Sequence, residues 1–205
     1  MLNNVIIKTV IELGKDECGM KKKGLVLLIV LSLLAATALT GCSSWNKNKQ
    51  KQGDDPKNQQ PKLATVEVVL YFSDDQAMYL VPEKRNITIE EEASDEVLAT
   101  NIIKELIAGP RNKELNATIP AEAKILSIKI NEGIASADFS KELQSKHWGG
   151  STGEGMTLNS IANTLTELDS IDKVQLLIEG KKVESLVGHW DTTVPLERNE
   201  DIIKK

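Results

Sequence analysis

The two cysteines are the residues best suited to covalent chemistry in this chain, and their surroundings differ. Cys42 ends the stretch Leu39-Thr40-Gly41-Cys42, which follows a run without charge from Gly24 to Ala38. A cysteine there can be a buried thiol, half of a disulfide or a modified thiol, and each alternative indicates a different compartment. Lysines 21–23 precede the run, so a basic segment, an apolar segment and small residues follow in the order of a secretory signal.

The end of this signal resembles the lipobox of bacterial lipoproteins, in which the cysteine thiol receives a diacylglycerol and the chain is cut just before it. Gly41 supplies the small residue beside the sulfur, and Leu39 supplies the apolar residue for the peptidase. An uncleaved anchor helix is the alternative, although a spanning helix needs roughly 20 apolar residues. We therefore expect residues 20–41 to be a lipoprotein signal peptide, with Leu39, Thr40 and Gly41 recognised by signal peptidase. Cys42 is the expected lipidation site, which would hold the protein on the extracytoplasmic face of the cell membrane.

Residues 1–19 do not fit this pattern, because secretory signals start with their basic residues. Met20 stands directly before the three lysines and is the expected start of translation. Lys15-Asp16 can be encoded AAG-GAY, which contains a ribosome-binding core upstream of Met20. We therefore predict that residues 1–19 are a mis-assigned upstream extension, which would remove Cys18 from the protein.

The charge is unevenly distributed along the rest of the chain. Residues 43–62 contain five lysines and two aspartates without apolar periodicity, and we predict a flexible basic linker there. Such a linker can contact anionic lipids or can simply stay solvated, and both alternatives remain open. Residues 63–205 contain 15 Lys and Arg against 25 Asp and Glu, a net charge of −10. An acidic domain without a basic stripe excludes nucleic acid as the expected partner.

Nothing in the sequence favours an enzyme. His147 and His189 are isolated, no nucleophile-elbow pattern is present, and the cysteines offer no pair for zinc. The glycine-rich segment 148–155 precedes a helical pattern, but Glu154 would repel a phosphate and no Gly-Lys-Ser/Thr ending follows. We expect no catalytic residues, no metal and no cofactor, and we interpret the glycine-rich segment as a flexible entry loop.

Hydrophobic periodicity predicts an α+β domain with a largely antiparallel sheet and two main helices packed on one face. The first helix begins after Ser94 as N-cap and ends at Gly109-Pro110. The second helix carries Leu158, Ile161 and Leu165 on one face. The expected strands are 65–72, 77–82, a separate short strand 86–89, the hairpin 123–130 with 134–139, and the hairpin 174–178 with 183–186. A short helical turn capped by Ser140 is expected at 141–143, and an extended tail or edge strand at 188–196.

Several motifs occur together in the order of a known family. They are YLVPE at 79–83, LIAGP at 106–110, GIASADFS at 133–140, SIANTLTEL at 160–168 and VQLLIEGKKVESLVGH at 174–189. On these residues the segment from Val66 to Arg198 resembles the GerMN domain family, and residues 63–205 are the expected domain. The resemblance implies a fold like the ring-building motif, a role in sporulation and spore germination, and no catalytic residues.

Two functions are therefore expected. The first is a lipid-anchored scaffold that joins protein partners in an envelope complex through exposed sheet edges, with its oligomeric state open. The second is a lipoprotein that binds a small ligand or a wall polymer and passes a signal to a membrane sensor. Convergence of Trp148, Trp190 and the neighbouring histidines on one pocket would favour the second function.

Overall fold

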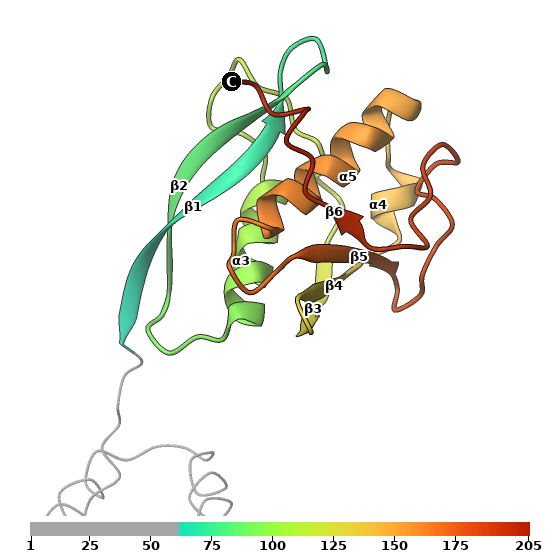
Figure 1. The fold of residues 1–205 in the computed structure, drawn as a ribbon. Coiled ribbons are helices and arrows are strands. Elements are labelled where there is room, and N and C mark those ends of the chain that lie inside the picture. The colour runs from blue at the N-terminus through green and yellow to red at the C-terminus, as the bar shows by residue number, and fades with distance from the viewer. Residues whose placement is uncertain (1–61) are drawn as a thin grey trace, which may run out of the picture. The chain divides into compact units, whose positions relative to one another are not determined.

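A computed structural model describes residues 62–205 and confirms the α+β class (Figure 1). The elements are β1 (Leu63–Ser73), β2 (Leu80–Glu90), α3 (Asp95–Ile107), β3 (Ile125–Asn131), β4 (Ile134–Phe139), α4 (Glu142–Ser145), α5 (Ser151–Leu165), β5 (Lys173–Ile178) and β6 (Leu196–Glu197). They form a two-stranded sheet, β1-β2, and a four-stranded sheet in the order β3-β4-β5-β6. All neighbouring strands are antiparallel except β4 and β5.

The β1–β2 hairpin is one uninterrupted ladder that pairs Leu63 with Glu90 at one end and Ser73 with Leu80 at the other. The prediction of a separate strand at 86–89 is therefore wrong, since these residues continue β2, and β2 begins at Leu80 rather than at residue 77. Pro82 lies within this continuous strand, and its backbone nitrogen points away from β1. Proline is compatible with that position because no ladder hydrogen bond is lost.

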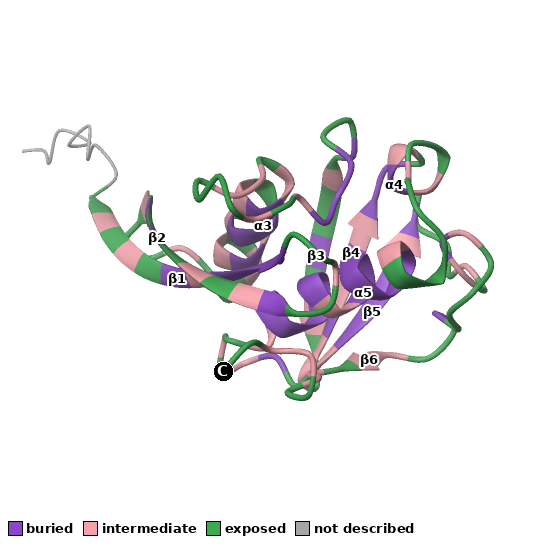
Figure 2. Cartoon of the chain, turned by 90° about the horizontal axis from the view of Figure 1, so that it is seen from above, coloured by how far each residue is buried: buried purple, intermediate pink, exposed green. Residues whose placement is uncertain are grey.

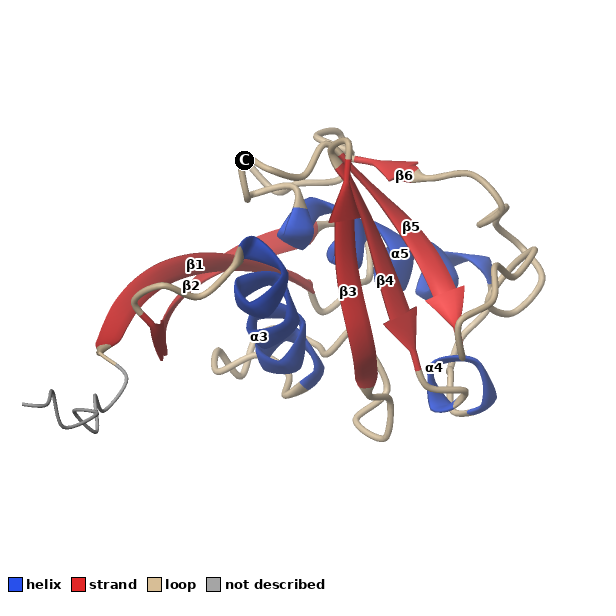
Figure 3. Cartoon of the chain, turned by 90° about the horizontal axis from the view of Figure 1, so that it is seen from below, coloured by secondary structure: helices blue, strands red, loops and turns tan. Residues whose placement is uncertain are grey.

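The four-stranded sheet is built from a tight hairpin and a crossover (Figure 3). β3 and β4 are joined through Glu132 and Gly133, both at positive φ (49° and 76°), which is the geometry of a two-residue turn and confirms the predicted hairpin. The chain then passes through α4 and α5 before β5 returns parallel to β4. A parallel neighbour requires such a long connection, whereas β6 closes the other edge as a short antiparallel strand.

The helix α3 confirms each of its sequence signals. The hydroxyl oxygen of Ser94 accepts a hydrogen bond from the backbone N–H of Val97 at 3.4 Å, and Asp95 and Glu96 occupy the first turn. Gly109 has a φ of +84°, so the chain leaves the helix through a conformation that favours glycine. The predicted core face is also correct in outline, because Ile102, Ile103 and Leu106 are buried.

One hydrophobic core joins the two main helices to both sheets (Figure 2). Alternate residues of β4 and β5 face it, which explains why Ala135, Ala137 and Phe139 are fully buried. The inner face of the hairpin adds Val68, Leu70 and Phe72 from the other side. The four-stranded sheet and the hairpin therefore enclose the apolar faces of α3 and α5.

Three local predictions fail. The segment 151–155 is helical, since α5 begins at Ser151, so only residues 148–150 form an entry loop. Residues 183–186 do not return as a strand, because backbone N–H groups of 186, 187 and 189 are bound by a carboxylate instead. The hydroxyl of Ser140 accepts from the backbone N–H of Lys124 and does not cap α4.

Candidate functional site

The predicted processing residues Leu39, Thr40, Gly41 and Cys42 lie outside the residues that the structure describes. Within residues 62–205, no group of three or more His, Cys, Asp or Glu side chains is placed to hold a metal ion. None of the helices in that same range is long and apolar enough to cross a membrane. The candidate sites are therefore buried polar clusters, an open strand edge and cavities.

Glu154 forms the first buried polar cluster, at the start of α5. Its side chain is fully buried. Oε1 accepts from the Ser185 hydroxyl at 2.6 Å and from the backbone N–H groups of Leu186 and Val187 at 2.8 and 3.1 Å, and Oε2 accepts from the backbone N–H of His189 at 2.9 Å. One carboxylate therefore organises the whole turn 185–189.

The hydrogen bonds to Glu154 also fix its ionisation. Burial alone would raise the pKa of this carboxyl, because the charged form loses its hydration. The Ser185 hydroxyl and the three backbone N–H groups outweigh that effect and lower the pKa below its ordinary value. Glu154 is therefore an ionised group that holds the turn 185–189 in place.

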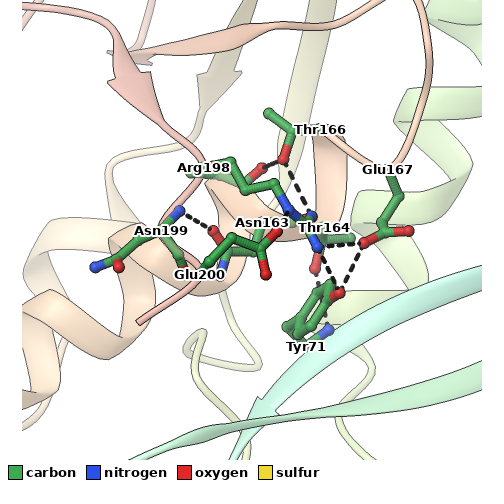
Figure 4. Close-up of polar contacts among 9 residues, drawn as sticks. Tyr71, Asn163, Thr164, Thr166, Glu167, Arg198, Asn199 and Glu200 are labelled. Carbon is green, nitrogen blue, oxygen red and sulfur yellow. Dashed lines mark hydrogen bonds and ion pairs between the residues drawn. The ribbon is translucent and has the colours of Figure 1, made fainter. Parts of the chain in front are cut away.

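A second polar cluster fastens the hairpin to the C-terminal end of α5 (Figure 4). The hydroxyl of Tyr71 on β1 donates to Glu167 at 2.7 Å and accepts from the guanidinium of Arg198 at 2.9 Å. Arg198 pairs with Glu167 at 2.8 Å and with Glu200, and its guanidinium carbon lies 5.4 Å from the centre of the Tyr71 ring. Three segments far apart in the sequence thus meet at one tyrosine.

This Tyr71 cluster extends through the helix itself. The backbone N–H of Tyr71 donates to the Thr164 hydroxyl at 3.1 Å, and its carbonyl accepts from the Ser160 hydroxyl at 2.6 Å. Asn163 exchanges two hydrogen bonds with the backbone of Asn199 at 2.8 and 2.9 Å. Burial, followed by the hydrogen bond to Glu167, raises the pKa of Tyr71, so the phenol stays protonated at neutral pH.

Arg85 lies in the middle of β2, opposite Val68 of β1. Its side chain is 2% exposed, pairs with Glu83 and Glu105, and donates to the backbone carbonyls of Glu105 and Gly109, each at 3.0 Å. Its guanidinium also lies over the ring of Phe72, 5.5 Å from the centre. These contacts hold the middle of the hairpin against the C-terminal end of α3, while Nε of the guanidinium is buried without a hydrogen-bond partner.

Beyond Arg85 the hairpin has an open edge, and we call residues 63–67 with 86–90 its free end. Near the turn, Ser73 exchanges backbone hydrogen bonds with Asn116, and Leu80 does so with residues 202 and 204. The same parity places the backbone groups of Lys84, Asn86 and Thr88 outward. Among the hydrogen bonds of the described residues, none reaches these outward groups. Figure 2 shows exposed and half-buried residues alternating along β1 of this end, whereas Ile87 on β2 is buried.

The aromatic residues singled out in the sequence gather around the first turns of α5 without sharing a pocket. Trp148 lines a cavity of about 370 Å³, but neither Trp190 nor His147 nor His189 does. The indole N–H of Trp190 donates to the carbonyl of Ser151 at 2.9 Å, and its ring lies against Gly155. The convergence that would favour ligand binding through both tryptophans is therefore not observed.

His147 supports the wall of this region from inside. Its Nε2 lies 2.9 Å from the Thr157 hydroxyl oxygen, and that hydroxyl donates to the carbonyl of Thr118. Nε2 must then carry the ring proton, which leaves Nδ1 buried without a hydrogen-bond partner. Burial accordingly lowers the pKa of His147, although Glu154 partly opposes the effect.

Comparison with known proteins places these features in a family. The family model Germane, described as sporulation and spore germination, matches residues 69–184. The chain belongs to the Germane family. The GerMN resemblance predicted from the motifs is thereby confirmed, and the matched segment contains the Arg85 cluster, Trp148 and Glu154 itself. No curated protein sequence matches the chain.

Solved structures resemble this Germane domain as well. The tandem GerMN domains of the sporulation protein GerM from Bacillus subtilis share 23% identity at a TM-score of 0.53, covering 76% of this chain and 51% of that one, which shows a shared fold. A candidate lipoprotein from Clostridium perfringens shares 33% identity over 67% of this chain and 90% of its own, with a TM-score of 0.48. The first GerMN domain of the same GerM shares 26% identity over 65% and 98%, with a TM-score of 0.48.

Proposed function

We propose that this Germane-domain protein is a lipid-anchored, non-catalytic assembly module on the extracytoplasmic face of the cell membrane. It would contribute to an envelope complex in sporulation or spore germination, the processes named for its family. The anchor is the lipid on Cys42, supplied through the signal at 20–41 and the Leu39-Thr40-Gly41 motif. The similarity to a candidate lipoprotein from Clostridium perfringens supports the same localisation.

The observation that carries the assembly role is the free end of the hairpin. Its outward backbone groups are unpaired with any described residue, while the polar, exposed side chains of Asn86 and Thr88 keep this edge soluble. An open strand edge can accept a strand from another protein through main-chain hydrogen bonds. The linker 43–62 enters the domain at Leu63, so the open edge adjoins the tether in the sequence.

A proline substitution tests this role without removing a side chain from the core. Thr88→Pro deletes one outward N–H and obstructs strand addition, whereas the ladder to β1 keeps all of its hydrogen bonds. Pro82 already occupies an outward position of the same strand. We expect Thr88→Pro to reduce the recovery of partner proteins after crosslinking in intact cells. Thr88→Ala, which keeps the N–H, should leave it unchanged.

The anchor is tested separately. Cys42→Ala should leave the chain unprocessed or misplaced, because no sulfur is available to the diacylglycerol, and fractionation with mass measurement checks this. A correctly trimmed, membrane-bound Cys42→Ala protein would contradict lipidation. Equal partner recovery by Thr88→Pro, Thr88→Ala and the wild type would instead contradict the use of the free end.

A further inference from the structure

The cavity beside Trp148 has the size and position of a small-ligand site. It measures about 370 Å³ and opens between the hairpin turn, the segment 116–118 and the first turns of α5. Small-molecule sites usually span about 300–1,000 Å³, so this cavity matches the lower part of that range. It is therefore large enough for a small ligand but not for a folded partner.

Trp148 provides an aromatic wall at this cavity. Its side chain is 49% exposed, and its ring stacks on that of His147 with centroids 6.0 Å apart and planes inclined by 21°. The same packing leaves no room for a side chain at Gly153, because a Cβ there would come within 2.8 Å of the Trp148 carbonyl oxygen. The indole is thus held in place while much of its surface stays available to an apolar ligand face.

Two residues with side-chain hydrogen-bond acceptors, Asp74 and Asn116, line the same cavity. Oδ1 of Asp74 accepts from the backbone N–H groups of Met78 and Tyr79 at 2.8 and 3.2 Å, and no described hydrogen bond reaches its Oδ2. Nδ2 of Asn116 donates to the carbonyl of Asp74 at 3.2 Å, which orients its own Oδ1. Asp74 is held through Oδ1 and Asn116 through Nδ2, so Oδ2 of Asp74 and Oδ1 of Asn116 can accept further hydrogen bonds. Such acceptors suit a ligand rich in hydroxyl or amide donors.

The remaining lining determines the charge of the ligand. The residues that line the cavity include one carboxylate, Asp74, and neither lysine nor arginine, so an anionic group is disfavoured. Ala77 and Met156 add apolar surface that a methyl group of a ligand could contact. A neutral sugar with an acetamido group presents an apolar ring face, hydroxyl donors, an amide N–H and a methyl. We propose that this cavity binds an N-acetylhexosamine unit of a glycan.

The matched control for this site is Trp190. It is 46% exposed and lies at the same end of α5, but it does not line the cavity. Replacing it therefore removes an indole of similar exposure that does not line the proposed site. The two tryptophan variants separate a specific platform from a general loss of aromatic surface.

The full-length protein in detergent is titrated with N,N′,N″-triacetylchitotriose and, in parallel, with its deacetylated form, by calorimetry. We expect saturable binding of the acetylated trimer, a loss of about tenfold or more in affinity for Trp148→Ala, and a change within about twofold for Trp190→Ala. Asp74→Asn should bind several-fold more weakly, because it retains the backbone contacts through Oδ1 and replaces the offered acceptor by a donor. Circular dichroism confirms that each variant is folded.

Three outcomes would overturn the proposal. They are no binding at millimolar sugar, equal losses for Trp148→Ala and Trp190→Ala, and preferential binding of the deacetylated, cationic trimer. The last outcome would indicate a site for amines formed by Trp148 and Asp74. Because the test uses purified protein, it does not depend on the proposed anchor or on partner proteins.

Discussion

The surroundings of α5 and the free end of the hairpin differ in how their polar groups are satisfied. Around α5, Glu154 and Tyr71 each bind several partners, and the hydroxyls of Ser160 and Thr164 hold the backbone of β1. At the free end, the same β1–β2 ladder continues, but its outward backbone groups have no partner among the described residues. The backbone edge near the turn is therefore paired within the domain, whereas the edge at the free end is available for contact, although Ile87 beside it is buried in the core.

This difference does not come from the strand pairing, because a single register runs along the whole hairpin. A substitution near α5 leaves buried donors or acceptors unpaired, which costs free energy. A substitution of an exposed residue of the free end, such as Thr88, changes groups that water already solvates, so the folded domain should tolerate it. We therefore expect substitutions near α5 to lower the free energy of unfolding more than substitutions of exposed residues at the free end.

The largest effect is expected for Glu154→Gln. The amide nitrogen replaces one acceptor, and at least one buried N–H in the turn 185–189 then faces a donor. We expect the free energy of unfolding to fall by about 2–4 kcal/mol, with faster hydrogen exchange at residues 186–189. Glu122→Gln, at an exposed position, serves as the control in the same urea titrations. If Glu154→Gln lowered the free energy of unfolding no more than Glu122→Gln does, the carboxylate would not organise the turn.

A smaller effect is expected for Tyr71→Phe. The substitution keeps the ring under Arg198 but removes the hydroxyl that joins Glu167 to the guanidinium. We expect a loss of about 1–2 kcal/mol in the free energy of unfolding. Tyr79→Phe removes a hydroxyl from a side chain that is 42% exposed and should have almost no effect. Equal effects of the two substitutions would contradict the fastening role of the Tyr71 cluster.

A modest pH dependence is expected from His147. Its pKa is lowered from 6.5 in the folded state, so the unfolded chain takes up this proton first as the pH falls. The stabilising contribution is complete above pH 6.5 and is lost as the pH falls from there toward the folded pKa. His147→Asn should flatten this part of the stability profile. Glu154 has a lowered pKa as well, and its contribution is lost only below its ordinary value of 4.5.

The smallest effect on stability is expected for Thr88→Ala. Its side chain is exposed on the outer face of the free end, and we expect a change within about 0.5 kcal/mol in the free energy of unfolding. Thermal unfolding monitored by circular dichroism is sufficient to detect a larger change. A loss comparable to that of Tyr71→Phe would mean that the free end is part of the cooperative core.

The same division explains how much could be predicted from the sequence. The helix α3 was predictable because its cap at Ser94, its apolar spacing and its stop at Gly109 are all local signals. The β3–β4 hairpin was predictable for the same reason. The continuity of β2 was not, since only the register shows that Pro82 faces away from β1.

The polar clusters could not be predicted from local patterns. The partners of Glu154 lie 31 to 35 positions along the chain, and those of Tyr71 lie 89 to 127 positions away. From the sequence, Glu154 in its glycine-rich segment indicated only that a phosphate would not bind there. The single available signal was the acidic residue at the first turn of an otherwise uncharged helix, and its true partners depend on the tertiary fold.

The most direct test of the assembly role compares the two ends of the hairpin in living cells. A photo-crosslinking amino acid is placed at Thr88, at the free end, or at Gln76, in the exposed turn at the opposite end. Irradiation of sporulating and germinating cells should give a discrete adduct with an envelope protein from position 88 and none from position 76. No adduct at position 88 in either stage, or the same adduct from both positions, would contradict the account.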